Sequence, residues 1–170
     1  MYAHYTRKHY PRKIPIAIED KVKAELNRMT ELGVVVKQEE PTDWANSMVT
    51  VIKPNGKIRI CIDPRELNKA ILLEHYPLKT VEEVISQMPN AKKVFSKLNA
   101  TSGFWQLRLD ENSSKLCTFN TSFGRYRFTR LPYGIKSAPE VFQKVISKMV
   151  SNIDGAEAII DDILAWGTNQ

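Results

Sequence analysis

Two adjacent aspartates, Asp161 and Asp162, are the residues of this sequence whose type and spacing most directly suggest chemistry. Apolar residues flank the pair on both sides, over 158–160 and 163–166. Two carboxylates in such surroundings are unfavourable unless a positive charge meets them, and Mg²⁺ prefers hard oxygen ligands. The pattern therefore predicts a hairpin with a metal-binding pair of carboxylates at its tip. The dipeptide alone is also typical of an ordinary turn.

A helix is predicted shortly before this pair in the sequence. It is capped by Ser137, entered through Pro139 and runs to about Val150. Its predicted buried face consists of apolar residues at helical spacing, namely Phe142, Val145, Ile146 and Met149.

Short strands and helices fill the rest of the chain. Helices are predicted over 18–32 and 81–88, and strands over 34–36, 47–53, 57–62, 94–98, 107–109, 116–119 and 126–129. Asn55-Gly56 joins the second and third of these strands and predicts a β-hairpin. The polar stretch Asp110–Ser114 is interpreted as a loop. Because strands and helices are segregated, the pattern favours an α+β fold.

The composition is that of an ordinary folded chain with a modest basic excess. Its 170 residues carry a formal net charge of +6, which permits a polyanionic partner without requiring one. Residues 1–18 contain four Lys or Arg and no acid, so they form either a solvated basic arm or one that faces phosphates. No apolar run long enough to span a membrane is present. Two cysteines without CxxC spacing predict neither a zinc site nor a disulfide framework, and a reducing compartment is expected.

Five groups of motifs occur in a fixed order along the chain. They are Asp43–Ser47; Lys53–Asp63 with Arg65–Asn68; Phe95–Asn99 with Ser102–Gln106; Thr118–Thr121, Phe123–Tyr126, Leu131–Ile135, Ser137–Pro139 and Phe142–Gln143; and Ile159–Leu164. On these motifs the chain resembles the fingers and palm of a reverse transcriptase of the kind found in gypsy-type LTR retrotransposons. The resemblance extends from about Pro11 to Gly167.

The resemblance implies a right-hand polymerase fold of the α+β class, with an antiparallel palm sheet and flanking helices. We expect the fingers over 1–72 and 107–137 and the palm over 73–106 and 138–170, together forming one reverse transcriptase domain. The sequence stops eight residues after Asp162. We therefore expect a palm truncated at its C-terminus, no thumb, and weak, salt-sensitive binding of template and primer.

The resemblance also implies a catalytic metal site. The palm of this family binds two Mg²⁺ ions through three aspartates; Asp161 and Asp162 match two of them, and Asn99 stands at the third position. An amide carries no charge and cannot bridge two ions with two oxygens. We expect a loss of at least about a thousandfold in rate, so this chain is predicted to be inactive or nearly so. Whether Asn99 reflects decay, engineering or a fold kept for binding stays open.

Nucleotide-binding positions follow from the same resemblance. Arg59 and Lys53 flank the hairpin and would meet the triphosphate, with Lys57 as a rival for Lys53. The alternative for these side chains is a solvated hairpin face.

The aromatic and glycine positions complete this expected pocket. Phe104 would stack under the sugar and exclude a 2′-hydroxyl, and Tyr133 would pack beside the sugar and the template base. Ser102 and Gly103 would offer backbone N–H groups to the phosphates. Core packing is the alternative for Phe104, and a helix-leading loop is the alternative for Tyr133.

Three further residues are expected near nucleic acid. Arg65 resembles a template-contacting position, and Gly134 allows a close approach of the backbone. Ile159 stands near the expected primer end, where many reverse transcriptases have Tyr.

Two functions from different classes remain open. The first is a deoxynucleotidyl transferase that extends a primer on an RNA or DNA template with dNTPs and Mg²⁺, within a retroelement polyprotein that also supplies a thumb and RNase H. The second is a non-catalytic nucleic-acid-binding or structural remnant of the same fold. The expected location is the cytoplasm, in a retroelement particle, or the nucleus, with no membrane partner.

Overall fold

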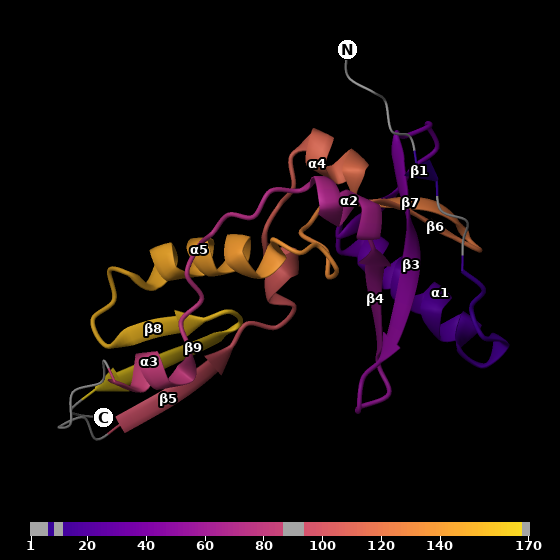
Figure 1. The fold of residues 1–170 in the computed structure, drawn as a ribbon. Coiled ribbons are helices and arrows are strands. Elements are labelled where there is room, and N and C mark those ends of the chain that lie inside the picture. The colour runs from indigo at the N-terminus through magenta and orange to yellow at the C-terminus, as the bar shows by residue number, and fades with distance from the viewer. Residues whose placement is uncertain (1–6, 9–11, 87–93, 168–170) are drawn as a thin grey trace, which may run out of the picture. The chain divides into compact units, whose positions relative to one another are not determined.

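The computed structural model describes residues 7–8, 12–86 and 94–167 (Figure 1). Residues 1–6 and 9–11 of the N-terminal basic segment, and residues 87–88 of the helix predicted over 81–88, lie outside this description. The chain divides into two compact units, the first formed by 1–71 with 104–136 and the second by 72–103 with 137–170. Each unit has its own sheet, and each is formed by two stretches that are separate in the sequence.

The first unit is built on a mixed sheet. Its strands are β1 (Arg7–Lys8), β2 (Val35–Lys37), β3 (Trp44–Ile52), β4 (Ile58–Asp63), β6 (Thr118–Thr121) and β7 (Gly124–Phe128). They run in the order β1-β3-β6-β7-β2, and β4 pairs with β3. The predicted Asn-Gly hairpin is confirmed, because β3 and β4 pair antiparallel on either side of it.

Three helices belong wholly to the first unit. Helix α1 (Ile16–Glu31) contacts β4 and β2 and buries Val22, Leu26 and Met29 at the spacing of one helix face. The second is α2 (Arg65–Ala70), which was not predicted, and the third is α4 (Glu111–Leu116). A short 3₁₀ helix, η1 (Gly103–Gln106), begins in the second unit and continues in the first.

Helix α4 corrects the loop predicted over 110–114. Asp110 caps it, since the Ser113 backbone N–H donates to the Asp110 carboxylate at 3.0 Å. Lys115 pairs with Glu111 one turn earlier at 3.0 Å. A polar segment is thus helical because its ends are capped and paired rather than because one face is apolar. The strand predicted over 107–109 is reduced to a single bridge between Arg108 and Arg130.

The second unit has a three-stranded antiparallel sheet in the order β5-β9-β8. Its strands are β5 (Val94–Asn99), β8 (Ala156–Ile159) and β9 (Asp162–Gly167), and its helices are α3 (Val81–Ser86) and α5 (Ala138–Val150). Helix α5 runs along β8, as Figure 1 shows, and Ala158 of β8 is fully buried.

The buried face of α5 differs from the predicted one. Phe142 and Ile146 are buried as expected, whereas Val145 is 37% and Met149 is 66% exposed. The helix instead turns Gln143 and Val150 inward. Gln143 can be buried because its amide is hydrogen-bonded, to the Ala158 carbonyl of β8 and to the Ile160 N–H that follows β8. Ser137 stands before the helix without the predicted side-chain capping bond.

The α+β class is confirmed by these two units. No helix among the described residues is long and apolar enough to cross a membrane.

Candidate functional site

The carboxylate turn, which we define as residues 160–162, joins β8 to β9 in the second unit. Strand register places Asn99 of β5 directly opposite Asp162 of β9. The Asn99 side-chain amide donates a hydrogen bond to Asp162 Oδ1 at 2.8 Å. The structure therefore brings together two residues that lie far apart in the sequence, at the ends of neighbouring strands.

Lys97 is the positive group at this turn, and the sequence argument missed it. Its ammonium lies 2.7 Å from Asp162 Oδ2. Because Lys97 and Asn99 are two residues apart on one strand, both reach the same face of the sheet. The Asn99 hydrogen bond, followed by the Lys97 ammonium, lowers the pKa of Asp162. Both oxygens of Asp162 are thus engaged, whereas Asp161 is exposed.

The backbone of the turn is unusual. Ile159 pairs with Asp162, so Ile160 and Asp161 form a two-residue hairpin connection. Ile160 has φ +52°, a conformation that β-branched residues rarely adopt. Positive φ at the first central residue only is the pattern of a type II′ turn, which normally takes glycine there. The Ala100 amide holds the other side by donating to the Asp161 carbonyl at 2.7 Å.

Gln143 of α5 is the second residue that the sequence argument missed as part of this site. Its side chain is only 1% exposed. Its Nε2 donates to the Ala158 carbonyl at 2.8 Å, and its Oε1 accepts the Ile160 N–H at 2.6 Å. A buried glutamine inside an apolar helix face was the available signal, because a buried amide needs partners.

A second group of predicted residues meets in the first unit, and we call it the aromatic cluster: Arg59, Phe104, Trp105 and Tyr133. The Arg59 guanidinium lies 4.6 Å from the Tyr133 ring centroid. The Tyr133 and Phe104 rings stack with centroids 5.0 Å apart. Stacked rings and a cation over an aromatic face are both favourable contacts. Tyr133 therefore contacts two other expected nucleotide-pocket residues, Arg59 and Phe104, which come from separate segments.

Trp105 and Arg28 extend the aromatic cluster. The Trp105 ring meets Tyr133 edge-on at 6.3 Å between centroids, and the Arg28 guanidinium lies 5.7 Å from the Trp105 centroid. Glu25 holds Arg28 through two hydrogen bonds of 2.8 and 2.7 Å. That pairing raises the pKa of Arg28, which stays charged. The Arg59 Nε and the Trp105 Nε1 are buried without a hydrogen-bond partner in the part of the chain that the structure describes.

The remaining predicted hairpin and template residues lie apart from one another. Lys53 is half-buried at the turn end of the β3–β4 hairpin. Arg59 of β4 pairs with Val51 of β3, which lies two residues before Lys53. Arg65 opens α2 with a side chain 78% exposed and contacts Asp63 at 3.2 Å. Arg12 of the N-terminal segment pairs with the same carboxylate. Asp63 thus lies between two arginines.

Two predicted glycines are required by packing. A Cβ at Gly103 would lie 2.9 Å from the Phe142 ring, and one at Gly134 would lie 2.2 Å from the Ile62 carbonyl oxygen. Gly134 also has φ +114°, and Ser102 next to Gly103 has φ +53°. These glycines fit close neighbours within the chain itself, whether or not a phosphate approaches them.

The ligand types at the carboxylate turn suit Mg²⁺, since it prefers carboxylate and amide oxygens. Their charge suits it less well. Over residues 12–86 and 94–167, no group of three or more His, Cys, Asp or Glu side chains is placed to hold a metal ion. Asn99 replaces one carboxylate, and Lys97 adds a positive charge. The turn therefore offers Mg²⁺ suitable oxygens with little net negative charge.

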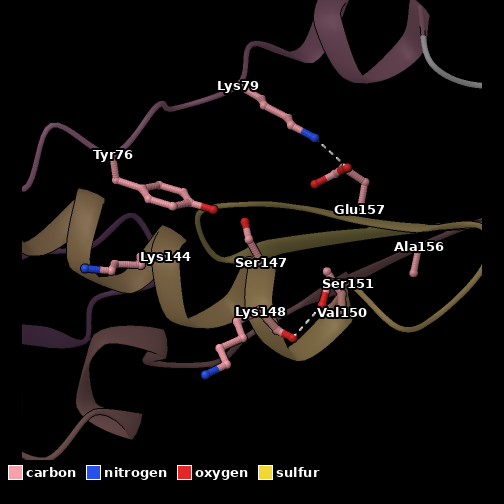
Figure 2. Close-up of a pocket in the computed structure, with 9 residues that line it drawn as sticks. All are labelled: Tyr76, Lys79, Lys144, Ser147, Lys148, Val150, Ser151, Ala156 and Glu157. Carbon is pink, nitrogen blue, oxygen red and sulfur yellow. Dashed lines mark hydrogen bonds and ion pairs between the residues drawn. The ribbon is translucent and has the colours of Figure 1, made fainter.

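A cavity of about 550 Å³ lies elsewhere in the second unit (Figure 2). Its walls come from α5, from the segment before α3 and from the start of β8: Tyr76, Lys79, Lys144, Ser147, Lys148, Val150, Ser151, Ala156 and Glu157. Figure 2 shows the three lysine side chains spreading around the cavity rather than converging. Lys79 is paired with Glu157 at 2.7 Å. Since Ile159 forms the opposite end of β8, this cavity is not the carboxylate turn, and none of the predicted site residues lines it.

Comparison with known families gives one clear match. The family described as "Reverse transcriptase (RNA-dependent DNA polymerase)" matches residues 51–169. The "Uncharacterized protein K02A2.6" of Caenorhabditis elegans is 36% identical over 156 residues, which cover 90% of this chain and 12% of that protein. The "Retrovirus-related Pol polyprotein from transposon 412" of Drosophila melanogaster is 40% identical over 116 residues, which cover 67% of this chain and 9% of the polyprotein. The chain thus spans about a tenth of the length of these relatives.

Solved structures share the fold. The prototype foamy virus protease-reverse transcriptase superposes with a TM-score of 0.84 at 22% identity, over 96% of this chain and 22% of the viral chain. The foamy viral protease-reverse transcriptase in complex with an RNA/DNA hybrid gives a TM-score of 0.83 at 21% identity over 96% of this chain and 22% of that one.

Proposed function

The chain belongs to the reverse transcriptase family, and from this premise we propose that it is the fingers and palm portion of a retroelement DNA polymerase. The proposed reaction is template-directed transfer of a deoxynucleotide from a dNTP to a primer 3′ end. The first unit would be the fingers and the second the palm. The partners would be an RNA or DNA template with its primer, and the remainder of a polyprotein in a cytoplasmic particle or the nucleus.

The observation that carries this proposal is the register of β5 and β9. It sets Asn99 against Asp162 beside the turn that bears Asp161. A carboxylate pair at a hairpin tip, next to a strand end that the family fills with aspartate, is the arrangement that a nucleotidyl transferase requires.

Asp161 and Asp162, with the Asn99 amide oxygen, are the residues that would hold Mg²⁺. When bound, Mg²⁺ lowers the barrier by activating the primer hydroxyl and stabilising the leaving pyrophosphate. The chain's own contribution is to fix the two carboxylates on adjacent positions of one turn. The Asn99 and Lys97 donors lower the pKa of Asp162 and so favour its ionised form.

The aromatic cluster would bind the nucleotide. Arg59, a planar guanidinium already oriented by the Tyr133 ring, would contact phosphate oxygens. Phe104, stacked on the same Tyr133 ring, would occupy the space that a 2′-hydroxyl needs. Lys53 at the hairpin end would add positive charge, and Ser102 and Gly103 would offer backbone N–H groups. Discrimination against ribonucleotides would then be steric.

Template and primer would meet other residues. Arg65 is exposed enough to reach a template phosphate. Ile159 and Gly134 would offer apolar and backbone surface to the primer end and the template, without hydrogen bonds from their side chains.

The activity of this chain is proposed to be low, because Asn99 removes one of three carboxylates. The same observation supports the second candidate, a non-catalytic nucleic-acid-binding remnant. In this chain the Lys97 ammonium and the Asn99 amide already engage both oxygens of Asp162.

Single-nucleotide primer extension separates the two candidates. The chain, its Asn99→Asp variant and a matched Asn99→Asp, Asp161→Asn double variant are compared with Mg²⁺ and one dNTP. Extension by Asn99→Asp alone supports the polymerase. Absence of extension by all three, with template–primer binding retained, supports the binding remnant.

A further inference from the structure

Gln143 is a polar side chain in the middle of the apolar core of the second unit. It lies on the buried face of α5 beside Phe142 and one turn before Ile146, and it is 1% exposed. Three contacts satisfy its amide. Besides the bonds to Ala158 and Ile160, its Nε2 donates to the Ser147 hydroxyl at 2.8 Å. Each of its two N–H groups and its carbonyl therefore has a partner.

Two of these three partners belong to the chain that leads into the carboxylate turn. The Ala158 carbonyl and the Ile160 N–H are two residues apart and flank Ile159. The Gln143 side-chain amide thus binds the last residues before Asp161 through both a donor and an acceptor. On the other side, the Ala100 N–H donates a hydrogen bond to the Asp161 carbonyl. The turn is therefore hydrogen-bonded both to α5 and to the residue that follows β5.

Ile160 is the residue that most needs such a hold. Its φ of +52° is unfavourable for a β-branched residue, and a conformation of this kind persists only where its surroundings impose it. The Ile160 N–H is the group that Gln143 accepts at 2.6 Å. Without that acceptor, a half-buried N–H loses its partner and the strained residue loses its restraint.

We infer that Gln143 is a positioning residue of the carboxylate turn, which holds Ile160 in its left-handed conformation and thereby sets where the Asp161 carboxylate lies. It does not touch substrate, and its effect on the reaction passes through the backbone of Ile160. Its importance for catalysis rests on the proposed polymerase function; its hold on the turn does not.

The experiment compares Gln143→Met, which keeps the volume and loses every hydrogen bond, with Gln143→Glu, which keeps the acceptor for Ile160. Ile146→Val is the matched control, because Ile146 is buried on the same helix face and makes no bond to the turn. All are made in the Asn99→Asp chain. The first readout is amide hydrogen exchange at Ile160, compared with core amides of β9, by NMR and corrected for global stability measured with urea. The second is kcat and KM for a single dNTP.

The expected result is specific to the turn. In Gln143→Met the protection of the Ile160 amide falls about tenfold more than that of core amides in β9, as the loss of one hydrogen bond to a buried group implies. In Gln143→Glu the Ile160 amide keeps most of its protection. In Ile146→Val all amides of the second unit change together. In primer extension, kcat falls about tenfold in Gln143→Met with an unchanged KM for the dNTP.

Other outcomes overturn the inference in distinguishable ways. If Ile160 exchanges in Gln143→Met no faster than in Ile146→Val at equal stability, Gln143 only fills the core. If Ile160 opens while kcat is unchanged, the turn does not need this hold for chemistry. If the Asn99→Asp parent itself shows no extension, the proposed function fails, while the exchange data still decide whether Gln143 holds the turn.

Discussion

The carboxylate turn of the second unit and the aromatic cluster of the first are held together by different forces. Around the turn, Asn99 and Ala100 donate hydrogen bonds, Gln143 accepts one from the Ile160 N–H, and Lys97 makes an ion pair; together they fix the backbone and Asp162. Asp161 itself is exposed to solvent. In the aromatic cluster, Arg59, Phe104, Trp105 and Tyr133 make ring contacts through Tyr133, and two buried N–H groups have no hydrogen-bond partner among the described residues.

This difference has a consequence for how each region responds to substitution. A hydrogen-bonded polar turn depends on charge, so the change of one atom in a side chain, as between Asn and Asp, alters what it can bind. A packed cluster depends on shape, so an isosteric change is tolerated and the loss of a ring is not. Substitutions that change charge should have their main effect at the carboxylate turn of the second unit. Substitutions that change side-chain volume, or conditions that ionise a buried group, should have their main effect in the first unit.

The largest expected effect is that of Asn99→Asp at the turn. If the proposed function holds, the added carboxylate would supply the third acidic ligand for Mg²⁺. Single-nucleotide extension with Mg²⁺ should rise at least about a thousandfold, which corresponds to about 4 kcal/mol. The Asn99→Asp, Asp161→Asn double variant should return to the starting rate. A gain of less than about tenfold would show that charge at this position is not what limits the chain.

Part of this comparison could be predicted from the sequence. The β3–β4 hairpin follows from Asn55-Gly56, and the β8–β9 hairpin from two apolar runs interrupted by Asp161-Asp162, because turn chemistry and period-two patterns are local. The positions of Asn99, Arg59 and Tyr133 came from motif resemblance, and their roles stay predictions. Local periodicity contains no information about which distant strand ends meet.

The missed features of the second unit share one physical reason. The inward rotation of α5, the role of Gln143 and the partner of Asp162 all depend on hydrogen bonds or ion pairs between remote segments. A pattern based on apolar spacing favoured Val145 and Met149 over Gln143, since it gives no weight to a polar side chain whose partners are unknown. Helix α4 was missed for a different reason: its stabilising contacts are local, a cap by Asp110 and a Lys115–Glu111 pair, and it has no apolar face for a spacing pattern to detect.

Alkaline pH should destabilise the first unit through Cys117, which is buried in its core. Burial, with a smaller contribution from the Asp110 charge, raises the pKa of its thiol to about 12. The thiol of an unfolded, solvated cysteine has a pKa near 9.0. Stability is therefore fully present below about pH 9 and falls as pH rises toward 12, by up to about 1.4 kcal/mol per pH unit.

Urea unfolding of the chain and of Cys117→Ala between pH 8 and 11 checks this sign. The loss of packing in Cys117→Ala is the same at every pH, so the difference between the two chains should shrink as pH rises. A difference that stays constant would mean that the Cys117 thiol titrates normally and that this core is wet. Cys61, half-buried beside Arg59, should be alkylated well before Cys117.

Removal of a ring tests the aromatic cluster. Tyr133→Ala takes away the surface on which both Arg59 and Phe104 stack, which is worth about 1–3 kcal/mol from an aromatic pair and a cation–π contact. In the Asn99→Asp chain, KM for a dNTP should rise about tenfold or more. Tyr133→Phe keeps the ring and should change KM less than about threefold. Equal losses in both variants would assign the effect to the hydroxyl and contradict a stacking cluster.

The smallest effect is expected at the Lys97–Asp162 pair, and it tests whether the turn depends on charge for its stability as well as for binding. Asn99 and then Lys97 lower the pKa of Asp162, so the folded state holds the ionised form more tightly than the unfolded state does. That contribution is present above the unfolded pKa, near 4, and is lost as pH falls through the lower folded pKa. Because the Lys97 side chain is 63% exposed, Lys97→Met should lower the free energy of unfolding at pH 7 by less than about 1 kcal/mol. The difference should vanish near pH 2 and in 1 M salt. A Lys97→Met effect that persists in both conditions would mean that the lysine stem, rather than its charge, stabilises the turn, and that the contrast between the two regions is smaller than their contacts indicate.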